Sequence, residues 1–152
     1  GLAQNFGQAF AKSQMAVGSN LPKSGTLFIS VKDSDKIKIL PICKKLLNLG
    51  FDIIATKGTS KYLEINNIKV TKINKVSEGR PHLVDAIKDG LVNIIFNTTE
   101  GEQSIKESFS LRRAALSANI PYYTTLAGSK AATEAIISLN KDELTVKSIQ
   151  SY

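Results

Sequence analysis

The chain has 152 residues, of which 42% are apolar and 22% charged, so the composition predicts one globular domain and excludes a disordered tail. Its net charge of +7 suits an anionic partner such as a nucleotide or a phosphorylated metabolite, although solubility alone accounts for such an excess equally well. One cysteine, Cys43, excludes a disulfide framework or zinc cluster, and one histidine excludes any site that needs two. We expect a cytoplasmic protein, because no apolar run reaches membrane-spanning length and the first residues lack a secretion signal.

The hydrophobic pattern predicts a short amphipathic helix followed by a domain in which strands and helices alternate. The helix covers residues 4–16, and a linker rich in Gly and Ser covers residues 18–25. Because a helix isolated by a linker cannot bury its own apolar face, we interpret residues 1–17 as the end of an upstream domain. The domain proper then covers residues 26–152.

Within that domain, the pattern predicts strands over residues 26–31, 51–55, 69–73, 92–96 and 120–123. The predicted helices cover residues 36–49, 60–66, 82–88, 103–118 and 130–139, with Pro81 at the start of the third, and residues 144–149 are predicted as an added edge strand. Strands that alternate with helices through short connections predict an α/β fold in three layers. Its mainly parallel, five-stranded sheet carries helices on both faces.

The turn after the second strand is a candidate anion site. An apolar run, Phe51–Ala55, leads into Thr56, Lys57, Gly58 and Thr59 and then into a helix. A strand, a turn with Gly and hydroxyl groups, and a helix N-terminus together direct free N–H groups and the positive end of the helix dipole at a ligand. Many such turns bind nothing, so the turn alone leaves both interpretations open.

The segments that follow the other predicted strands strengthen the case. In a parallel sheet they lie at one edge, where ligands of α/β proteins bind. They supply hydroxyl, amide and ammonium groups with few carboxylates, which suits a phosphate. A sheet covered by helices on both faces has polar loops at that edge whether or not a ligand binds there, so this alternative interpretation stays open. The segments are residues 32–36, 56–59, 74–75, 97–99 and 124–125.

Support for catalysis within the chain is weaker. The acid–base candidates near these loops are Asp33, Asp35, Glu78 and His82. We interpret the two aspartates as helix caps and His82 as local support, and Cys43 lies on a helix face without an evident base. No catalytic or metal-binding residue is therefore predicted. Nucleic-acid binding is disfavoured, because the lysines are scattered and Trp is absent.

The loops also carry a recognisable set of motifs. They are Ala55-Thr56-x-Gly58-Thr59, Asn74-Lys75-Val76-x-Glu78-Gly79-Arg80-Pro81-His82, Ile95-x-Asn97-Thr98-Thr99 and Arg112-Arg113-x-Ala115-Leu116. With them the chain resembles the C-terminal regulatory domain of the large subunit of bacterial carbamoyl phosphate synthetase, which has a methylglyoxal synthase-like fold. The resemblance runs over roughly residues 25–149, and residues 9–14 resemble the end of the preceding synthetase domain.

The resemblance implies an allosteric site that binds UMP, an inhibitor, or IMP. The residues it assigns to that pocket are Lys36, Thr56, Thr59, Lys75, Val76, Asn97 and Thr99, and those it assigns to a bordering ornithine site are Tyr122 and Thr124. It implies as partners the rest of the large subunit, the glutaminase small subunit and a second copy of the domain. The resemblance further implies that the domain itself needs no cofactor, and that the whole ligase, which serves arginine and pyrimidine synthesis, uses ATP, Mg or Mn, and K.

Two departures from the family pattern bear on function. Glu100 and Glu102 stand where the family often has arginines, which places acid at the rim of the pocket. Arg80 follows Gly79 where methylglyoxal synthase has its catalytic aspartate, which argues against a phosphate-eliminating enzyme of that type. That enzyme remains the alternative function, together with a passive oligomerisation module.

Overall fold

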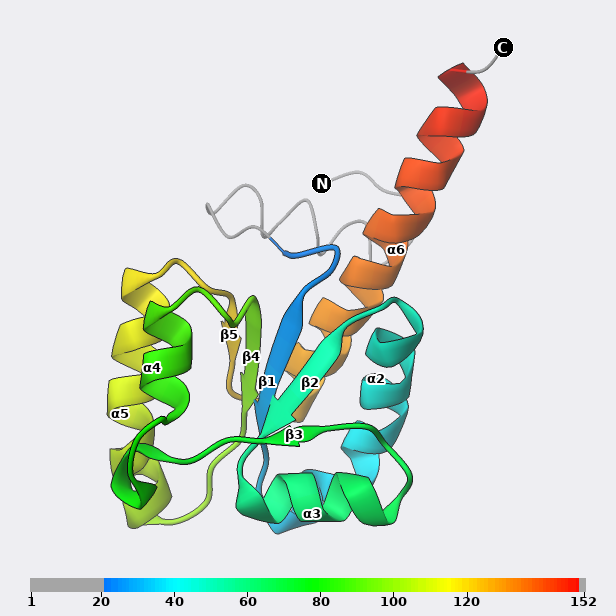
Figure 1. Cartoon of the computed structure of the whole chain (residues 1–152). Helices are drawn as coiled ribbons and strands as arrows, with labels where there is room; N and C mark the ends of the chain where they lie inside the picture. Colours follow the sequence, from blue (N-terminus) through cyan, green and yellow to red (C-terminus); the bar gives the residue numbers. More distant parts are fainter. Residues whose placement is uncertain (1–20, 151–152) are drawn as a thin grey trace.

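The computed structural model describes the backbone of residues 21–150 and the side chains of residues 21–141, and Figure 1 shows its arrangement. The predicted helix over residues 4–16 lies outside the described residues. The elements in chain order are β1 (Thr26–Ser30), a 3-10 turn η1 (Asp33–Asp35), α2 (Lys36–Asn48), β2 (Asp52–Ala55), α3 (Lys57–Ile65), β3 (Thr71–Lys72), η2 (Val76–Glu78), α4 (Leu83–Lys88), β4 (Ile94–Asn97), α5 (Glu102–Ser117), β5 (Tyr122–Tyr123) and α6 (Leu126–Gln150).

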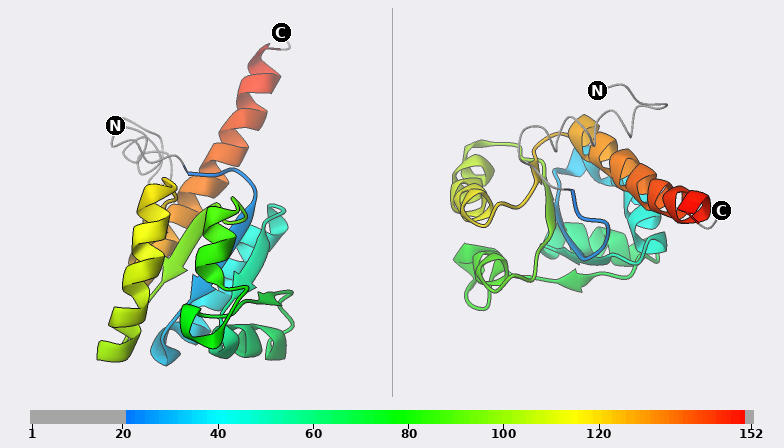
Figure 2. Two further views of the ribbon diagram at one scale, coloured as in Figure 1. Left: turned by 60° about the vertical axis from the view of Figure 1, so that its left-hand side comes forward. Right: turned by 90° about the horizontal axis from the view of Figure 1, so that it is seen from above.

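The five strands form one sheet in the order β3-β2-β1-β4-β5, and every pairing is parallel. Helices α4 and α5 cover one face, whereas α2 and α6 lie on the other, as both views in Figure 2 show. The predicted three-layer α/β architecture is therefore confirmed. The chain runs outward from β1 in one direction and from β4 in the other, so the sheet has its topological switch point between these two strands.

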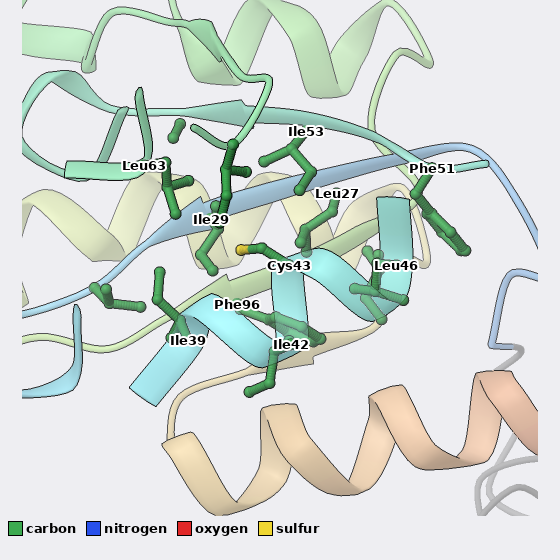
Figure 3. Close-up of a cluster of buried hydrophobic side chains, with 14 of the residues drawn as sticks. Leu27, Ile29, Ile39, Ile42, Cys43, Leu46, Phe51, Ile53, Leu63 and Phe96 are labelled. Atoms are coloured by element: carbon green, nitrogen blue, oxygen red, sulfur yellow. The ribbon is translucent and has the colours of Figure 1, made fainter. Parts of the chain in front are cut away.

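The central strand β1 shows why its sequence is apolar on both faces. Leu27 and Ile29 point into a core formed with α2, α3 and α6, which Figure 3 shows in close-up. Phe28, between them, points into a second core formed with α4 and α5. Successive side chains of a strand alternate between the faces of a sheet, so a strand covered on both sides must be apolar throughout.

The ends of α2 and α4 follow from local chemistry. Gly50 adopts φ +94°, and its N–H and that of Phe51 donate to the carbonyls of Leu47 and Leu46 at 2.9 and 3.0 Å, which confirms Gly50 as the residue that ends α2. Pro81 was expected in the first turn of α4, but α4 begins at Leu83. His82 occupies the N-cap position, and its Nδ1 accepts a hydrogen bond from the Asp85 N–H at 3.3 Å.

Other boundaries also differ from the prediction: β3, β4 and β5 are shorter or shifted by one or more residues, and α6 begins at Leu126 instead of residue 130. Helix α3 begins at Lys57 instead of residue 60, because the turn itself forms the first helical turn. The edge strand predicted over residues 144–149 is wrong, because α6 runs on to Gln150 and extends past the sheet (Figure 1). No Gly or Pro after Gly128 interrupts the helix, so nothing in the local sequence ends it. None of the described helices combines the length and the apolar character that a membrane crossing needs.

The buried thiol of Cys43 gives a first testable prediction. Burial raises its pKa to about 12, so the native thiol stays protonated and unreactive at pH 8. We expect iodoacetamide to leave the native chain unmodified at pH 8 and to label it fully in urea, as mass spectrometry would show. The unfolded thiol ionises from about pH 9 and the native thiol only near 12, so stability is lost as pH rises across this interval. A Cys43→Ala variant should lack this part of the decline.

Candidate functional site

A cavity of about 490 Å³ opens at the carboxyl ends of β1 and β4, at the switch point of the sheet. The end of β1, the start of α3, the loop before α4 and the first turns of α5 form its walls. Its polar lining includes Ser30, Lys32, Asp33, Lys36, Thr56, Thr59, Lys75, Asn97, Thr98, Thr99, Glu100, Ser104, Glu107 and Ser108, and its apolar lining includes Phe28, Val31, Val76, Leu83 and Leu111.

Hydroxyl groups fix the backbone where β1 enters the cavity. The Val31 N–H donates to Thr59 Oγ1 at 3.1 Å, and the Lys32 N–H donates to Thr98 Oγ1 at 3.0 Å. Ser30 Oγ lies 2.8 Å from Thr56 Oγ1 in a hydrogen bond between the two hydroxyls. The end of β1 is thus tied to α3 on one side and to the end of β4 on the other.

These bonds leave the N-terminus of α3 without a side-chain cap. Thr56 occupies the N-cap position, but its hydroxyl is turned to Ser30 and makes no capping bond. The Ser60 N–H donates to the Thr56 carbonyl at 2.8 Å, so the N–H groups of the three residues before Ser60 have no partner within the helix. Gly58 leaves space in front of these N–H groups. A Cβ at that position would lie 3.4 Å from Lys36 Nζ and would occupy this space.

Lys36 provides one ammonium group of the cavity. Its side chain is 18% exposed and pairs with the carboxylate of Asp33, which is 92% exposed. The hydrogen bond from Lys36, supported by its charge, lowers the pKa of Asp33. Asp33 was interpreted as a helix cap, and this is wrong, because its side chain binds Lys36. Asp35 is at the N-cap position of α2 but makes no capping hydrogen bond.

Lys75 provides a second ammonium group from the loop before α4. Its Nζ lies 3.6 Å from Glu107 Oε2 across the cavity, and both side chains are partly exposed. Glu107 belongs to α5, so this ion pair joins the two walls. An anionic ligand that binds Lys75 would have to displace the Glu107 carboxylate. This displacement costs little free energy, because water screens the ion pair.

Asn97, at the end of β4, is a buried polar residue of the cavity wall and is 5% exposed. Its Nδ2 donates to Ser108 Oγ at 3.0 Å and to the Tyr122 hydroxyl at 2.7 Å. Burial raises the pKa of Tyr122, so this hydroxyl is protonated at neutral pH. The Arg112 guanidinium lies over the Tyr122 ring, 5.9 Å from its centroid.

The structure brings all the residues predicted for the nucleotide pocket into this one cavity; they are Lys36, Thr56, Thr59, Lys75, Val76, Asn97 and Thr99. Tyr122 and Thr124 do not line it. Tyr122 lies behind Asn97, and Thr124 is exposed in the connection from β5 to α6. Of the two rim acids, Glu100 lines the cavity and Glu102 does not.

Sequence reasoning missed the wall that α5 provides. Ser104, Glu107, Ser108 and Leu111 face the cavity at helical spacing i, i+3, i+4 and i+7. The two serines one helical turn apart, in line with Glu107 and Leu111, would have identified the wall. Ser30 was also missed, although its hydroxyl interrupts the apolar run from Leu27 to Val31. Among residues 21–141 no group of three His, Cys, Asp or Glu side chains could hold a metal ion.

Comparison with known proteins identifies the family. The model of the MGS-like domain matches residues 38–124, which is more than half of the chain. The chain belongs to the MGS-like domain family. Methylglyoxal synthase from Elizabethkingia anophelis NUHP1 has the same fold, with a TM-score of 0.61 at 18% identity over 74% of this chain and 79% of that protein.

This MGS-like domain is also similar over its whole length to parts of much longer proteins. It is 52% identical over 152 residues to the carbamoyl phosphate synthase large chain of Mesorhizobium japonicum and 47% identical to that of Methanobrevibacter smithii. The large chain of Pseudomonas syringae pv. tomato is 51% identical over 90% of the domain. The chain spans only 13–14% of the length of these relatives.

Proposed function

We propose that the chain is the regulatory MGS-like domain of a carbamoyl phosphate synthase large chain, and that its cavity binds UMP or IMP. The observation that carries the proposal is the uncapped N-terminus of α3 beside the ammonium groups of Lys36 and Lys75 in one cavity. Free N–H groups, a helix dipole and two lysines are the groups that bind a phosphate. Identity of 47–52% to large chains over the whole domain supports the larger context.

The two halves of the cavity suit the two parts of a nucleotide. The start of α3 and Lys36 offer positive charge to a phosphate, while Val76 and the wall of α5 offer apolar surface and hydroxyl groups to a nucleoside. The cavity volume of about 490 Å³ is in the range of small-molecule sites. In this proposal a nucleotide regulates the enzyme because it binds one state of the whole protein better than another.

The proposal extends to the rest of the assembly. Tyr122 and Thr124 contribute to an ornithine site at the border with the synthetase domain, and residues 1–17 are the end of that domain, joined by the linker of residues 18–25. The partners are the rest of the large chain, the glutaminase small subunit and a second copy of the domain, in the cytoplasm. The domain itself catalyses nothing, and ATP, Mg or Mn, and K serve the synthetase domains.

Calorimetric titration with UMP, on the wild-type chain and on Gly58→Ala, tests the proposal. We expect micromolar binding to the wild type and at least tenfold weaker binding to the variant, because the added methyl group fills the space between Lys36 Nζ and the start of α3. Stability should be unchanged or rise by up to about 1 kcal/mol, since Ala favours a helix over Gly. Lost binding in an equally stable variant separates a ligand site from a structural role.

Lys57→Ala is the matched control, because Lys57 is exposed in the same helical turn and does not line the cavity. It should bind UMP within about threefold of the wild type. Absence of UMP and IMP binding to the wild type at millimolar concentration would contradict the proposal. In that case self-association of the chain would favour an oligomerisation module, and phosphate release from dihydroxyacetone phosphate would favour the enzyme.

A further inference from the structure

The hydrogen bonds around Asn97 determine which of its amide atoms faces the cavity. Ser108 Oγ donates to the Ser104 carbonyl one helical turn earlier at 2.8 Å, so its single proton is committed to that bond. Towards Asn97, 3.0 Å away, Ser108 can therefore only accept. The opposite amide orientation would place two acceptors against each other, so Nδ2 must face Ser108.

The second hydrogen of the same amide is used by Tyr122. Nδ2 donates to the Tyr122 hydroxyl at 2.7 Å, so both amide hydrogens are bound by protein side chains. The Oδ1 atom has no hydrogen-bond partner among the described residues, yet within that part of the chain no fully enclosed side-chain oxygen or nitrogen lacks one. Because Asn97 lines the cavity, Oδ1 opens onto it.

We propose that Tyr122 and Ser108 are positioning residues that lock Asn97 with its amide oxygen towards the cavity, so that the site selects a ligand group that donates a hydrogen bond at this point. Neither residue has to touch the ligand through these bonds. This inference rests on the proposed nucleotide site and adds a specificity to it. A nucleoside monophosphate can offer such a donor from a ribose hydroxyl or a base N–H, whereas a group that only accepts is rejected.

The difference in affinity between ligands with and without this donor follows from the cost of an unpaired polar atom. When a ligand lacks the donor group, the fixed Asn97 oxygen makes no hydrogen bond to it. The oxygen is then a polar atom without a partner in the complex, which lowers the affinity for that ligand. An amide that can rotate would present NH₂ instead and lose the discrimination. The Ser108 and Tyr122 hydroxyls together keep the amide from rotating. The Tyr122 hydroxyl also connects the cavity to the surface where Arg112 covers the Tyr122 ring.

The decisive variant combines Tyr122→Phe, which removes the hydroxyl and keeps the ring under Arg112, with Ser108→Ala, because Ser108 alone would still accept from Nδ2 and hold the amide. The ligands are UMP and three analogues that each lack one donor, namely 2′-deoxy, 3′-deoxy and N3-methyl UMP. We expect one analogue to bind the wild type at least tenfold more weakly than UMP, and this gap to shrink below threefold in the double variant Tyr122→Phe/Ser108→Ala. Affinity for inorganic phosphate, which uses the other half of the cavity, should not change.

A second measurement needs no ligand. In the wild type the Asn97 side-chain NH₂ resonances should be protected from hydrogen exchange and show contacts to Tyr122 and Ser108, and in Tyr122→Phe this protection should be lost. Tyr123→Phe is the control, because Tyr123 packs against the other core. It should behave as the wild type in both measurements.

The outcomes are distinguishable. Unchanged discrimination in the double variant, or unchanged amide protection in Tyr122→Phe, would overturn the inference. Equal losses for UMP and inorganic phosphate would show a structural role instead. Absence of UMP binding to the wild type would overturn the proposed function and the ligand selectivity together. The amide resonances would then still decide whether Tyr122 orients Asn97.

Discussion

Replacing Lys36 by alanine is expected to weaken UMP binding about 10- to 100-fold, which corresponds to the loss of about 1.5–3 kcal/mol from a hydrogen bond to a charged group. Lys36 Nζ lies where a side chain at Gly58 would reach it, so it faces the uncapped start of α3. It is also mostly enclosed, and an ammonium group shielded from water binds an anion more strongly than an exposed one. Calorimetric titration of the variant measures the loss.

Lys38→Ala is the control for this prediction, because Lys38 is exposed on the same helix and does not line the cavity. It removes the same charge and should change the affinity less than threefold at physiological salt. Asp33→Asn tests the role of Lys36 further. It removes the carboxylate that competes for Lys36, so affinity should rise if the ammonium binds the phosphate directly. A fall in both Lys36→Ala and Asp33→Asn would contradict direct binding and indicate that the ion pair shapes the loop.

Stability should hardly respond to either change. The Lys36–Asp33 pair has a fully exposed carboxylate, and such pairs contribute little to folding because water and salt screen them. The site can therefore be altered while the fold is kept. This separation follows from the architecture, in which the sheet and its two cores carry stability and the strand ends carry the polar groups.

The sequence predicted those parts of the molecule that depend on local pattern and on general topology. β1 was identified because a strand covered on both faces must be apolar, as Leu27, Phe28 and Ile29 are. Thr56, Lys75 and Asn97 follow different strands and are far apart in the chain. They were expected together because parallel strands end at one edge, and the structure places them in one cavity.

The rest depended on contacts that a local pattern cannot show. The wall of α5 faces the cavity only because of how that helix packs on the sheet, so Glu107 opposite Lys75 was not predicted. The orientation of Asn97 depends on Tyr122, 25 positions later in the chain. The error at residues 144–149 has another cause, since Thr145 and Val146 favour a strand locally, while a helix that has already formed continues until something ends it.

Replacing Phe96 by alanine is expected to lower the free energy of unfolding by about 3–5 kcal/mol, a large part of the total stability of a domain of this size. Phe96 lies in β4, is fully buried in the core with α2 and α6, and meets the ring of Tyr123 edge to face at 5.9 Å between centroids. Its loss would leave a cavity between the sheet and helices α2 and α6 that neighbouring side chains cannot fill without moving these elements. Urea denaturation followed by circular dichroism measures the change.

Phe109→Ala is the matched control, because the Phe109 side chain is 62% exposed on α5 and its truncation should change stability by no more than about 0.5 kcal/mol. Phe96→Leu should cost about 1–2 kcal/mol, since it keeps most of the buried volume. Similar effects of Phe96→Ala and Phe109→Ala would contradict the packing described for β4.

Phe96 also precedes Asn97 on the strand, so Phe96→Leu should retain UMP binding only if the core tolerates the change without shifting Asn97. A parallel fall in stability and affinity would show that the packing beneath β4 holds the binding residue in place, whereas a fall in stability alone would show that the bonds to Ser108 and Tyr122 suffice.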